Sequence, residues 1–295
     1  MNGELFLRSV AWGALVLVVG ASRGVPAGNP ERGKTVFTLA AGCSCHTSQE
    51  GPVGAGGGEV PTPFGTFYGP NITPDVETGI GSWTTAEIDA AIRGGWVKGK
   101  GAEAPAMPYY RYAGMAAADA RDLIAYLRSL PPVRRPNRPH EVRIPLARWA
   151  YRGWRLLFFR RPVPPTTAPP AGAARGRYLV DHVAICGDCH TPRNRLGAPN
   201  HALYLAGTTH GPDGRVVPNI TPDPTGIGDW DTGDIVNLLT LGMMPNFDNV
   251  QGLMATVVDG KAGGPGYARA PQRDLRAIAE YLKSVPPIDN VVDDK

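Results

Sequence analysis

Two stretches of the chain carry apolar residues at helical spacing and end at a pair of prolines. In "AADARDLIAYLRSLPP" Leu123 and Leu127 fall on one stripe, and "QRDLRAIAEYLKSVPP" repeats the design with Leu275 and Leu282. A stripe with this period marks a helix that turns one face to a core, and proline cannot continue a helix. We therefore expect two similar amphipathic helices.

A third helix is predicted from its end signals. Thr84 or Thr85, followed by Glu87, can form an N-cap ahead of "AEIDAAIRGG", and Gly94 and Gly95 mark the stop. The alternation of apolar and polar residues that marks strands is scarce along the chain. The pattern as a whole indicates a mainly α protein.

These helices belong to a longer internal repeat. Four blocks recur in the same order, at offsets that drift from 143 to 155 residues: "RGKTVFTLAAGC" and "RGRYLVDHVAIC", "NITPD" twice, "GIGSWTTAEI" and "GIGDWDTGDI", and "AYLRSLPPV" and "EYLKSVPPI". The drift falls in loops, whereas the offset holds inside each block. The chain is therefore expected to contain two copies of one fold.

The repeat sets the expected domain boundaries, which are residues 28–133, residues 171–289, a linker of residues 134–170 and a tail of residues 290–295. Each copy runs through a helix, a Cys-Cys-His turn, a long Gly/Pro-rich loop, the "NITPD" turn, a helix, a Met-containing loop and a closing helix. The linker is Pro-rich at its ends and basic and aromatic from Trp149 to Phe159. Two interpretations of that centre stay open. It can be a short helix that plugs the seam between domains, or a patch that docks on a membrane surface or a partner.

The N-terminus indicates export. Arg8 precedes the apolar run Val10–Gly20, and small residues suited to cleavage follow from Ala21 to Ala27. That run is short for a membrane-spanning helix and fits a signal peptide, so residues 1–27 are expected to be removed. An uncleaved anchor is the alternative. The net charge of +4, without a basic run interleaved with aromatics, excludes nucleic acid as the expected partner.

The candidate chemistry lies in "CGDCH", where Cys186, Cys189 and His190 have the spacing of covalent c-type haem attachment. The alternatives are half of a zinc site, a redox-active cysteine pair and a structural disulfide. Zinc would need a second ligand pair, and a thioredoxin-like pair would need a βαβ context. With the export signal and the repeated neighbourhood, the motif predicts a haem with His190 as an iron ligand.

The repeat also selects the second axial ligand. Among the six methionines, Met107 and Met254 stand at equivalent positions, 147 residues apart. Met243 or Met244 is the fallback in the second copy. A methionine ligand raises the reduction potential of a haem relative to a second histidine.

The corresponding stretch of the first copy, "CSCH", lacks one residue between its cysteines. Cys43 aligns with Cys186 from upstream, whereas Cys45 and His46 align with the second motif from downstream. Residues two apart lie about 200° round a helix, so both cysteines face one porphyrin edge only after a local backbone change. We expect haem to bind here through His46 and Met107, with Cys45 the surer thioether and Cys43 uncertain.

Further residues recur in both copies. Trp83 with Trp230, and Asn71 with Asn219, are candidate hydrogen-bond donors to haem propionates, although each tryptophan can equally be the largest core residue of its copy.

Two glycines also recur, at equivalent places in the first helices. At Gly33 and Gly176, a missing Cβ would let the closing helix, with Tyr126 or Tyr281, cross closely. The Gly-rich residues 54–65 lack the lysine of a phosphate loop and are expected to wrap the haem.

With these elements, the chain resembles the cytochrome c subunits of bacterial membrane-bound alcohol, sorbitol and gluconate dehydrogenases. The resemblance covers residues 29–289 and rests on stretches such as "PTPFGTFYGPNITPDVETGIGSW", "AMPYYRYAGM", "RPNRPHEVRIP", "RLLFF" and "CGDCHTPRN". It implies class I cytochrome c-like domains, His/Met-ligated haems, a periplasmic location and electron relay from a dehydrogenase toward the respiratory chain. Those subunits typically hold three haems, whereas this chain carries two units.

The favoured hypothesis is thus a periplasmic di-haem electron carrier without an activity of its own, whose partners are a dehydrogenase subunit, an oxidase or another cytochrome. One rival is a haem enzyme, either a di-haem peroxidase or a cytochrome that oxidises a small sulfur compound. Such an enzyme needs an open iron site, and the two matched methionines argue against one. The other rival is a docking module with a single haem in the second copy.

Overall fold

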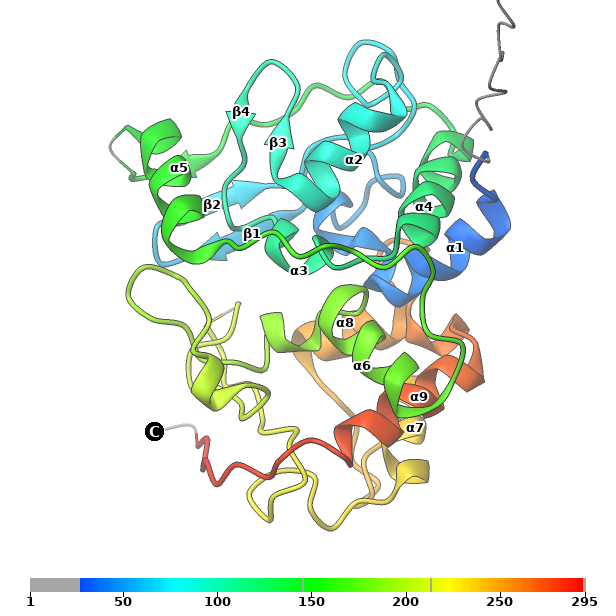
Figure 1. Cartoon of the computed structure of the whole chain (residues 1–295), viewed down its shortest axis with the longest axis vertical. Coiled ribbons are helices and arrows are strands. Elements are labelled where there is room, and N and C mark those ends of the chain that lie inside the picture. Colours follow the sequence, from blue (N-terminus) through cyan, green and yellow to red (C-terminus); the bar gives the residue numbers. More distant parts are fainter. Residues whose placement is uncertain (1–26, 145, 213, 294–295) are drawn as a thin grey trace, which may run out of the picture.

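The structure is a computed structural model that describes residues 27–144, 146–212 and 214–293 (Figure 1). The predicted signal peptide or anchor therefore lies almost wholly outside the described residues. The first copy contains, in order, α1 (Pro30–Leu39), η1 (Ala41–His46), β1 (Glu59–Thr62), β2 (Gly65–Tyr68), α2 (Thr85–Gly94), β3 (Trp96–Val97), β4 (Gly101–Ala102), α3 (Tyr109–Tyr112) and α4 (Ala117–Ser129).

The linker adds β5 (Glu141–Val142) and α5 (Ala147–Phe158). The second copy contains α6 (Gly172–His182), η2 (Cys186–Asp188), η3 (His201–Leu203), α7 (Thr232–Leu241), α8 (Gly252–Asp259), η4 (Tyr267–Arg269) and α9 (Gln272–Leu282). The described chain is mainly helical, as the sequence predicts, and the two copies lie one above the other in Figure 1.

In each copy the first helix crosses the closing helix at a glycine. A Cβ on Gly33 of α1 would stand 1.9 Å from the carbonyl oxygen of Asp122 in α4, and one on Gly176 of α6 would stand 1.8 Å from that of Ala277 in α9. A side chain larger than hydrogen therefore cannot fit at either crossing. The predicted role of these glycines is confirmed, including the neighbouring Cβ atoms of Tyr126 and Tyr281.

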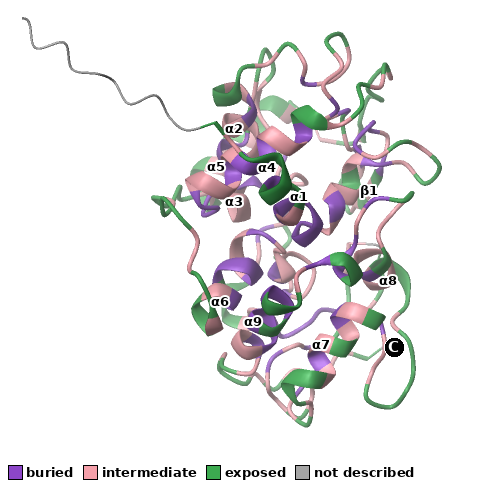
Figure 2. Cartoon of the chain, turned by 90° about the vertical axis from the view of Figure 1, so that its right-hand side faces the viewer, coloured by how far each residue is buried: buried purple, intermediate pink, exposed green. Residues whose placement is uncertain are grey.

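The apolar faces of these four helices join one continuous core, in which Leu123, Leu127, Leu275 and Leu282 are buried as their spacing predicts. Figure 2 shows the buried residues gathered on the inner sides of α1, α4, α6 and α9. Met115 of the first copy is fully buried in the same core. The two domains are thus fused through apolar contacts.

The predicted helix ends are also confirmed in α2. The side chain of Thr84 accepts a hydrogen bond from the N–H of Glu87 at 3.2 Å, and the Glu87 carboxylate accepts one from the N–H of Thr84 at 2.7 Å. Gly95 ends the helix in the left-handed region with φ 58°. Both devices satisfy backbone groups that a helix end leaves open.

The predicted plug between the domains is confirmed by one residue of α5. Trp154 is 8% exposed and packs edge-on against Tyr109 of α3. Its indole N–H donates to the carbonyl of Leu196 in the second copy at 3.0 Å. The linker helix therefore ties both domains with a single buried side chain.

Two segments expected to be irregular are ordered against the first domain. The Gly/Pro-rich loop contains the antiparallel hairpin β1–β2, in which Glu59 pairs with Tyr68 and Thr62 with Gly65. The linker strand β5 extends that hairpin to the order β1-β2-β5. Gly65 permits this close approach, because a Cβ there would stand 2.2 Å from the carbonyl oxygen of Glu141.

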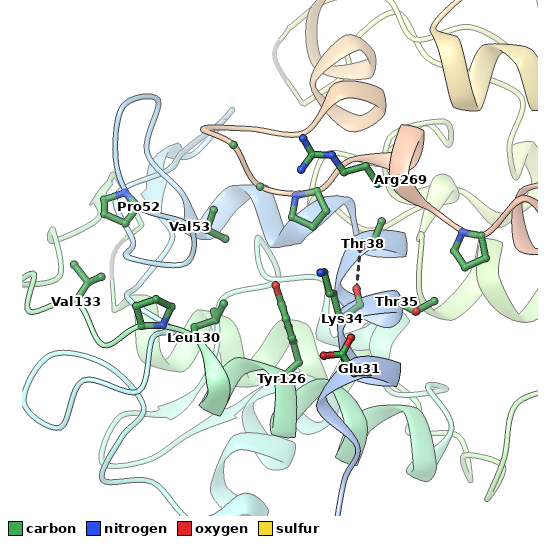
Figure 3. A pocket seen from close by; sticks show the side chains of 15 residues that line it. Glu31, Lys34, Thr35, Thr38, Pro52, Val53, Tyr126, Leu130, Val133 and Arg269 are labelled. Atoms are coloured by element: carbon green, nitrogen blue, oxygen red, sulfur yellow. Dashed lines mark hydrogen bonds between the residues drawn. The ribbon is translucent and has the colours of Figure 1, made fainter.

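An open groove of about 690 Å³ follows the seam on the outer side of α1 (Figure 3). Lys34 and Thr38 of α1, Tyr126 of α4, and Arg269 of the second copy line it, and no cysteine, histidine or methionine does. Within the described residues, no helix is both long and apolar enough to cross a bilayer.

We predict that Gly33→Ala destabilises the protein. The added methyl group meets the Asp122 carbonyl and forces α1 away from α4, so the free energy of unfolding should fall by about 1–3 kcal/mol or more. Chemical denaturation measures this change. Gly94→Ala is the matched control, because a Cβ on Gly94 meets nothing within 4 Å and its φ is not left-handed. Equal effects of the two substitutions would contradict the assigned crossing.

Candidate functional site

The second Cys-Cys-His turn follows the end of α6. Ile185 turns the chain with φ 50° and ψ 39°, and η2 begins directly at Cys186. The carbonyl of Cys186 then accepts from the N–H of Cys189 at 3.3 Å and from the N–H of His190 at 3.0 Å. This single helical turn gathers the two thiols and the imidazole at one place, as their spacing predicts.

Each histidine of the two turns is held by the carbonyl of a proline. The Nδ1 atom of His190 lies 2.9 Å from the oxygen of Pro218, and that of His46 lies 2.9 Å from the oxygen of Pro70. A carbonyl only accepts, so Nδ1 carries the hydrogen and Nε2 keeps its lone pair for a metal. Desolvation by the surrounding protein lowers the pKa of both partly buried imidazoles, which favours the neutral, ligating form.

The shortened turn of the first copy is built on an unusual backbone. Ala41, Gly42 and Cys43 all lie in the left-handed region, with φ 51°, 62° and 47°. The second copy uses one such residue, Ile185, before its first cysteine. The predicted local backbone change is therefore confirmed, and it absorbs the missing residue upstream of Cys45.

The thiols of the two turns are all unpaired. Burial raises the pKa of Cys43, Cys186 and Cys189 to about 12, and desolvation of the thiol by the surrounding protein raises the pKa of Cys45 as well. Cys43 and Cys186 both pack against the common core, whereas Cys45 keeps part of its residue surface open to solvent. The predicted alternatives of a disulfide or a low-pKa redox pair find no support in these thiols.

The Gly-rich loop of the first copy lies directly over its Cys-His turn. A Cβ on Gly69 would stand 1.9 Å from the carbonyl oxygen of Cys45, and one on Gly58 would stand 2.2 Å from the same atom. The N–H of Gly56 donates to the carbonyl of His46 at 2.8 Å, and Gly207 makes the equivalent bond to His190 at 2.9 Å. The loop thus encloses the turn, which is the arrangement expected of a haem-wrapping loop.

The two candidate methionine ligands occupy different local structures. Met107 lies in a turn closed by hydrogen bonds to Ala104 and Tyr109, whereas Met254 lies in the first turn of α8. The expectation of a Met-containing loop is thus wrong for the second copy. Pro105 and Pro108 keep a helix from forming around Met107, and no proline stands near Met254.

The hairpin before each methionine supports their pairing. Trp96 pairs with Ala102 in the first copy, and Met243 pairs with Asn249 in the second, so the offset of 147 residues holds through this region. Met243 and the adjacent Met244 therefore belong to the hairpin. The structure leaves Met107 and Met254 as the equivalent pair.

The predicted propionate donors divide into two groups. Asn71 uses both amide hydrogens within the protein, on Thr78 at 3.0 Å and on the carbonyl of Val133 at 2.7 Å. Asn219 does the same with Thr225 and Ile288. Both asparagines therefore tie the "NITPD" turn to the chain after the closing helix, and their predicted propionate role finds no support. The matched tryptophans, Trp83 and Trp230, pack against the core, so their propionate role stays a prediction.

The two Cys-Cys-His turns meet at the domain seam. In the first copy, a Cβ on Gly42 would stand 2.7 Å from the carbonyl oxygen of Pro265, and η1 packs against α8 of the second. In return, Arg111 of α3 donates to the carbonyl of Gly187 in η2 at 3.2 Å. Each turn is thus contacted by the other domain.

Three consecutive residues of α3 reach the second turn, and the sequence interpretation did not single them out. The Tyr110 hydroxyl donates to the carboxylate of Asp188, which also accepts from Arg193 at 2.7 Å. Arg111 reaches the same turn through its hydrogen bond to the carbonyl of Gly187, and its charge opposes the rise in the pKa of the Cys186 thiol that burial causes. Burial raises the pKa of Tyr112, and thiols of both copies raise it further.

One signal for these residues was present in the sequence. Tyr112 and Tyr267 stand 155 residues apart, which is the offset of the closing helices. Tyr267 is 3% exposed and lies near Tyr112 and Cys189. The repeat thus places one tyrosine of each copy at the junction of the two turns.

The geometry agrees with comparisons to known proteins. The family model for cytochrome c matches residues 30–131, the first copy. A di-haem c-type cytochrome of Cereibacter sphaeroides is 40% identical over 271 residues, which cover 89% of this chain and 88% of that protein. The chain belongs to the cytochrome c family. As a member, it binds haem c and transfers electrons, and its predicted resemblance is confirmed.

Cytochrome subunits of dehydrogenases are also similar to this cytochrome. The cytochrome c subunit of a quinone-type alcohol dehydrogenase from Gluconacetobacter polyoxogenes is 38% identical over 88% of this chain. The fructose dehydrogenase cytochrome subunit of Gluconobacter japonicus is 36% identical over 85% of it. The chain spans about half the length of these two relatives, 56% and 51%.

We predict that Arg111→Gln lowers the reduction potential of the haem expected at Cys186 and Cys189. A nearby positive charge disfavours the additional charge of ferric iron, so its removal should lower the potential by an amount on the order of tens of millivolts. Redox titration followed by visible absorption measures both haems. Arg121→Gln is the charge-matched control, because Arg121 lies within α4 with its backbone carbonyl against Gly28. An unchanged potential in Arg111→Gln would contradict the assigned proximity.

Proposed function

We propose that this cytochrome is a periplasmic di-haem electron carrier that relays electrons from a dehydrogenase toward the respiratory chain. One observation carries the proposal: the chain has two Cys-Cys-His turns, each with its histidine bonded to a proline carbonyl, and each turn contacts the other domain at the seam. In such a carrier, haem c supplies one-electron chemistry through the ferrous and ferric states of its iron. The protein residues attach, orient and enclose the cofactor.

Each site has its own set of holding residues. His190 and Met254, with the thiols of Cys186 and Cys189, would hold one haem. His46 and Met107, with the thiol of Cys45, would hold the other. The donor chemistry fits the group, because each imidazole is fixed through Nδ1 and keeps Nε2 for iron.

The buried contacts between the two domains hold the two proposed haem sites in a fixed arrangement, which suits electron transfer. The hydroxyl of Tyr178 donates to Asp119 at 2.7 Å and accepts from the N–H of Ala116 at 3.1 Å, across the domains. Electron carriers need little rearrangement between oxidation states, and a rigid seam meets that need. Methionines at the matched positions Met107 and Met254 would fill both iron sites, which supports a carrier over a peroxidase.

The partner and location follow from the relatives and the N-terminus. Several relatives are cytochrome subunits of alcohol, fructose and gluconate dehydrogenases, which supports a dehydrogenase as electron donor. The apolar run Val10–Gly20 supports export to the periplasm. We place the carrier at the membrane surface within that compartment.

The proposal predicts two covalently bound haems per chain. Intact mass of the protein purified from a periplasm should show both additions. Cys43→Ser should keep two haems, whereas Cys45→Ser should lose the covalent haem of the first copy, since Cys45 and His46 keep the register of the second motif. The pyridine haemochrome spectrum reports one or two thioethers per haem. A single haem on the wild-type chain would overturn the di-haem assignment.

Met254 is predicted to be the iron ligand of the second haem. Met254→Ala should therefore convert one haem of the pair from a low-spin to a high-spin absorption spectrum and leave the other unchanged. Met243→Ala and Met244→Ala are the matched controls, and both should keep two low-spin haems because these residues lie in the hairpin. A high-spin signal in either control, with a low-spin Met254→Ala, would reassign the ligand.

A further inference from the structure

Helix α5 has a second apolar face, which the seam does not cover. Leu146, Trp149, Leu156 and Leu157 are 77%, 67%, 85% and 70% exposed. Trp149 and Leu156 are seven residues apart, so they share one side of the helix, about 140–160° from the buried Trp154. The helix lies at the outer edge of the first domain (Figure 1), where this face points away from the core.

Exposed arginines lie within α5 and on both sides of it in the sequence. They are Arg143, Arg148, Arg152, Arg160 and Arg161. The guanidinium of Arg152 stacks over the ring of Trp149 at 5.2 Å from its centre. No acidic residue occurs in the sequence between Glu141 and Asp181. The exposed side of α5 is therefore both apolar and basic.

The arginines of α5 fall into two groups, one that contacts the rest of the protein and one that is exposed. Arg155 donates to the carbonyl of Gly94 and stacks over the ring of Phe159 at 4.5 Å. That arginine belongs to the fold. Arg148 and Arg152 instead flank the exposed apolar side chains, where their charge serves no contact with the core.

We propose that α5 lies flat on an anionic phospholipid bilayer, with Leu146, Trp149, Leu156 and Leu157 inserted among the lipids. A helix with a Trp/Leu face and a ring of basic side chains is suited to the interface plane of a membrane. Tryptophan favours the headgroup level, and arginine pairs with lipid phosphates through two parallel hydrogen bonds. The helix itself carries no acidic side chain that would repel anionic lipids, and Glu103, which lies near Tyr151 of α5, is largely buried.

A bilayer suits this face better than a protein partner does. Its side chains project from a single convex helix and are 67–85% exposed. Protein interfaces concentrate their free energy in aromatic and arginine anchors set in well-packed pockets, whereas a fluid lipid surface accepts a convex ridge. The surface attachment rests on α5 and is separate from haem binding, so each can fail alone.

Vesicle flotation of the full holo-cytochrome tests this proposal. The protein is mixed with phosphatidylcholine vesicles, with and without phosphatidylglycerol, and the readout is the increment in bound protein caused by the anionic lipid. That increment excludes any charge-independent contribution from the N-terminal apolar run. We expect a clear increment at low salt that decreases as salt rises.

Two double variants and one control test whether the additional binding to anionic vesicles depends on α5. Trp149→Ser combined with Leu156→Ser should lower binding by about tenfold or more, and Arg148→Gln combined with Arg152→Gln should remove most of the salt-sensitive part. Leu241→Ser combined with Phe247→Ser is the control, since these residues are 63% and 83% exposed but lie in the second copy. All variants should retain the visible spectrum and haem content of the wild type, which shows that they fold.

Two results would overturn the proposal. One is the absence of an anionic increment in the wild-type protein, or an increment that the α5 variants leave intact. The other is normal lipid binding by the α5 variants together with slower reduction by the partner dehydrogenase, which would make this face a protein-docking site. Loss of haem from the wild type would instead concern the carrier function alone.

Discussion

The close crossing of the first and closing helices is the constraint on which the rest of each domain depends. At Gly33 and Gly176 the two backbones touch without intervening side chains. Because the crossing fixes where the first helix ends, it also fixes where the Cys-Cys-His turn begins. The closing helix is fixed by the same contact, and with it the chain that follows, which the asparagine of each "NITPD" turn ties back.

The sequence predicted those local features that covalent geometry or steric limits restrict to a few residue types. The glycine crossings and the cap at Thr84 were readable because each depends on a residue type that few alternatives can replace. For the linker, the sequence left a plug and a docking patch open, and it did not single out Trp154. The same holds for Cys186, Cys189 and His190, whose spacing alone defines a turn. The placement of these residues in the structure agrees with the predictions.

Other features could not be predicted because they depend on contacts between distant segments. Strand β5 forms only because the linker returns to the hairpin at Gly65, 76 residues before Glu141. The hydrogen bond from the amide of Asn71 to the carbonyl of Val133 likewise depends on a segment that follows the closing helix. Tyr110 and Arg111 act on the opposite domain, and single-copy patterns carry no information about that packing.

The shortened first turn shows how two fixed flanks tolerate a deletion. Upstream, Gly33 holds α1 against α4. Downstream, the carbonyl of Pro70 holds the imidazole of His46. The backbone between these anchors must change its path, and it does so at Ala41, Gly42 and Cys43, where left-handed conformations cost about 1–2 kcal/mol for each residue with a Cβ. Gly42 avoids part of that cost, and burial of Cys43 against the core offsets more of it. The altered backbone path therefore lies upstream of Cys45, and the hydrogen bond that orients the imidazole of His46 matches that of His190 in the second copy.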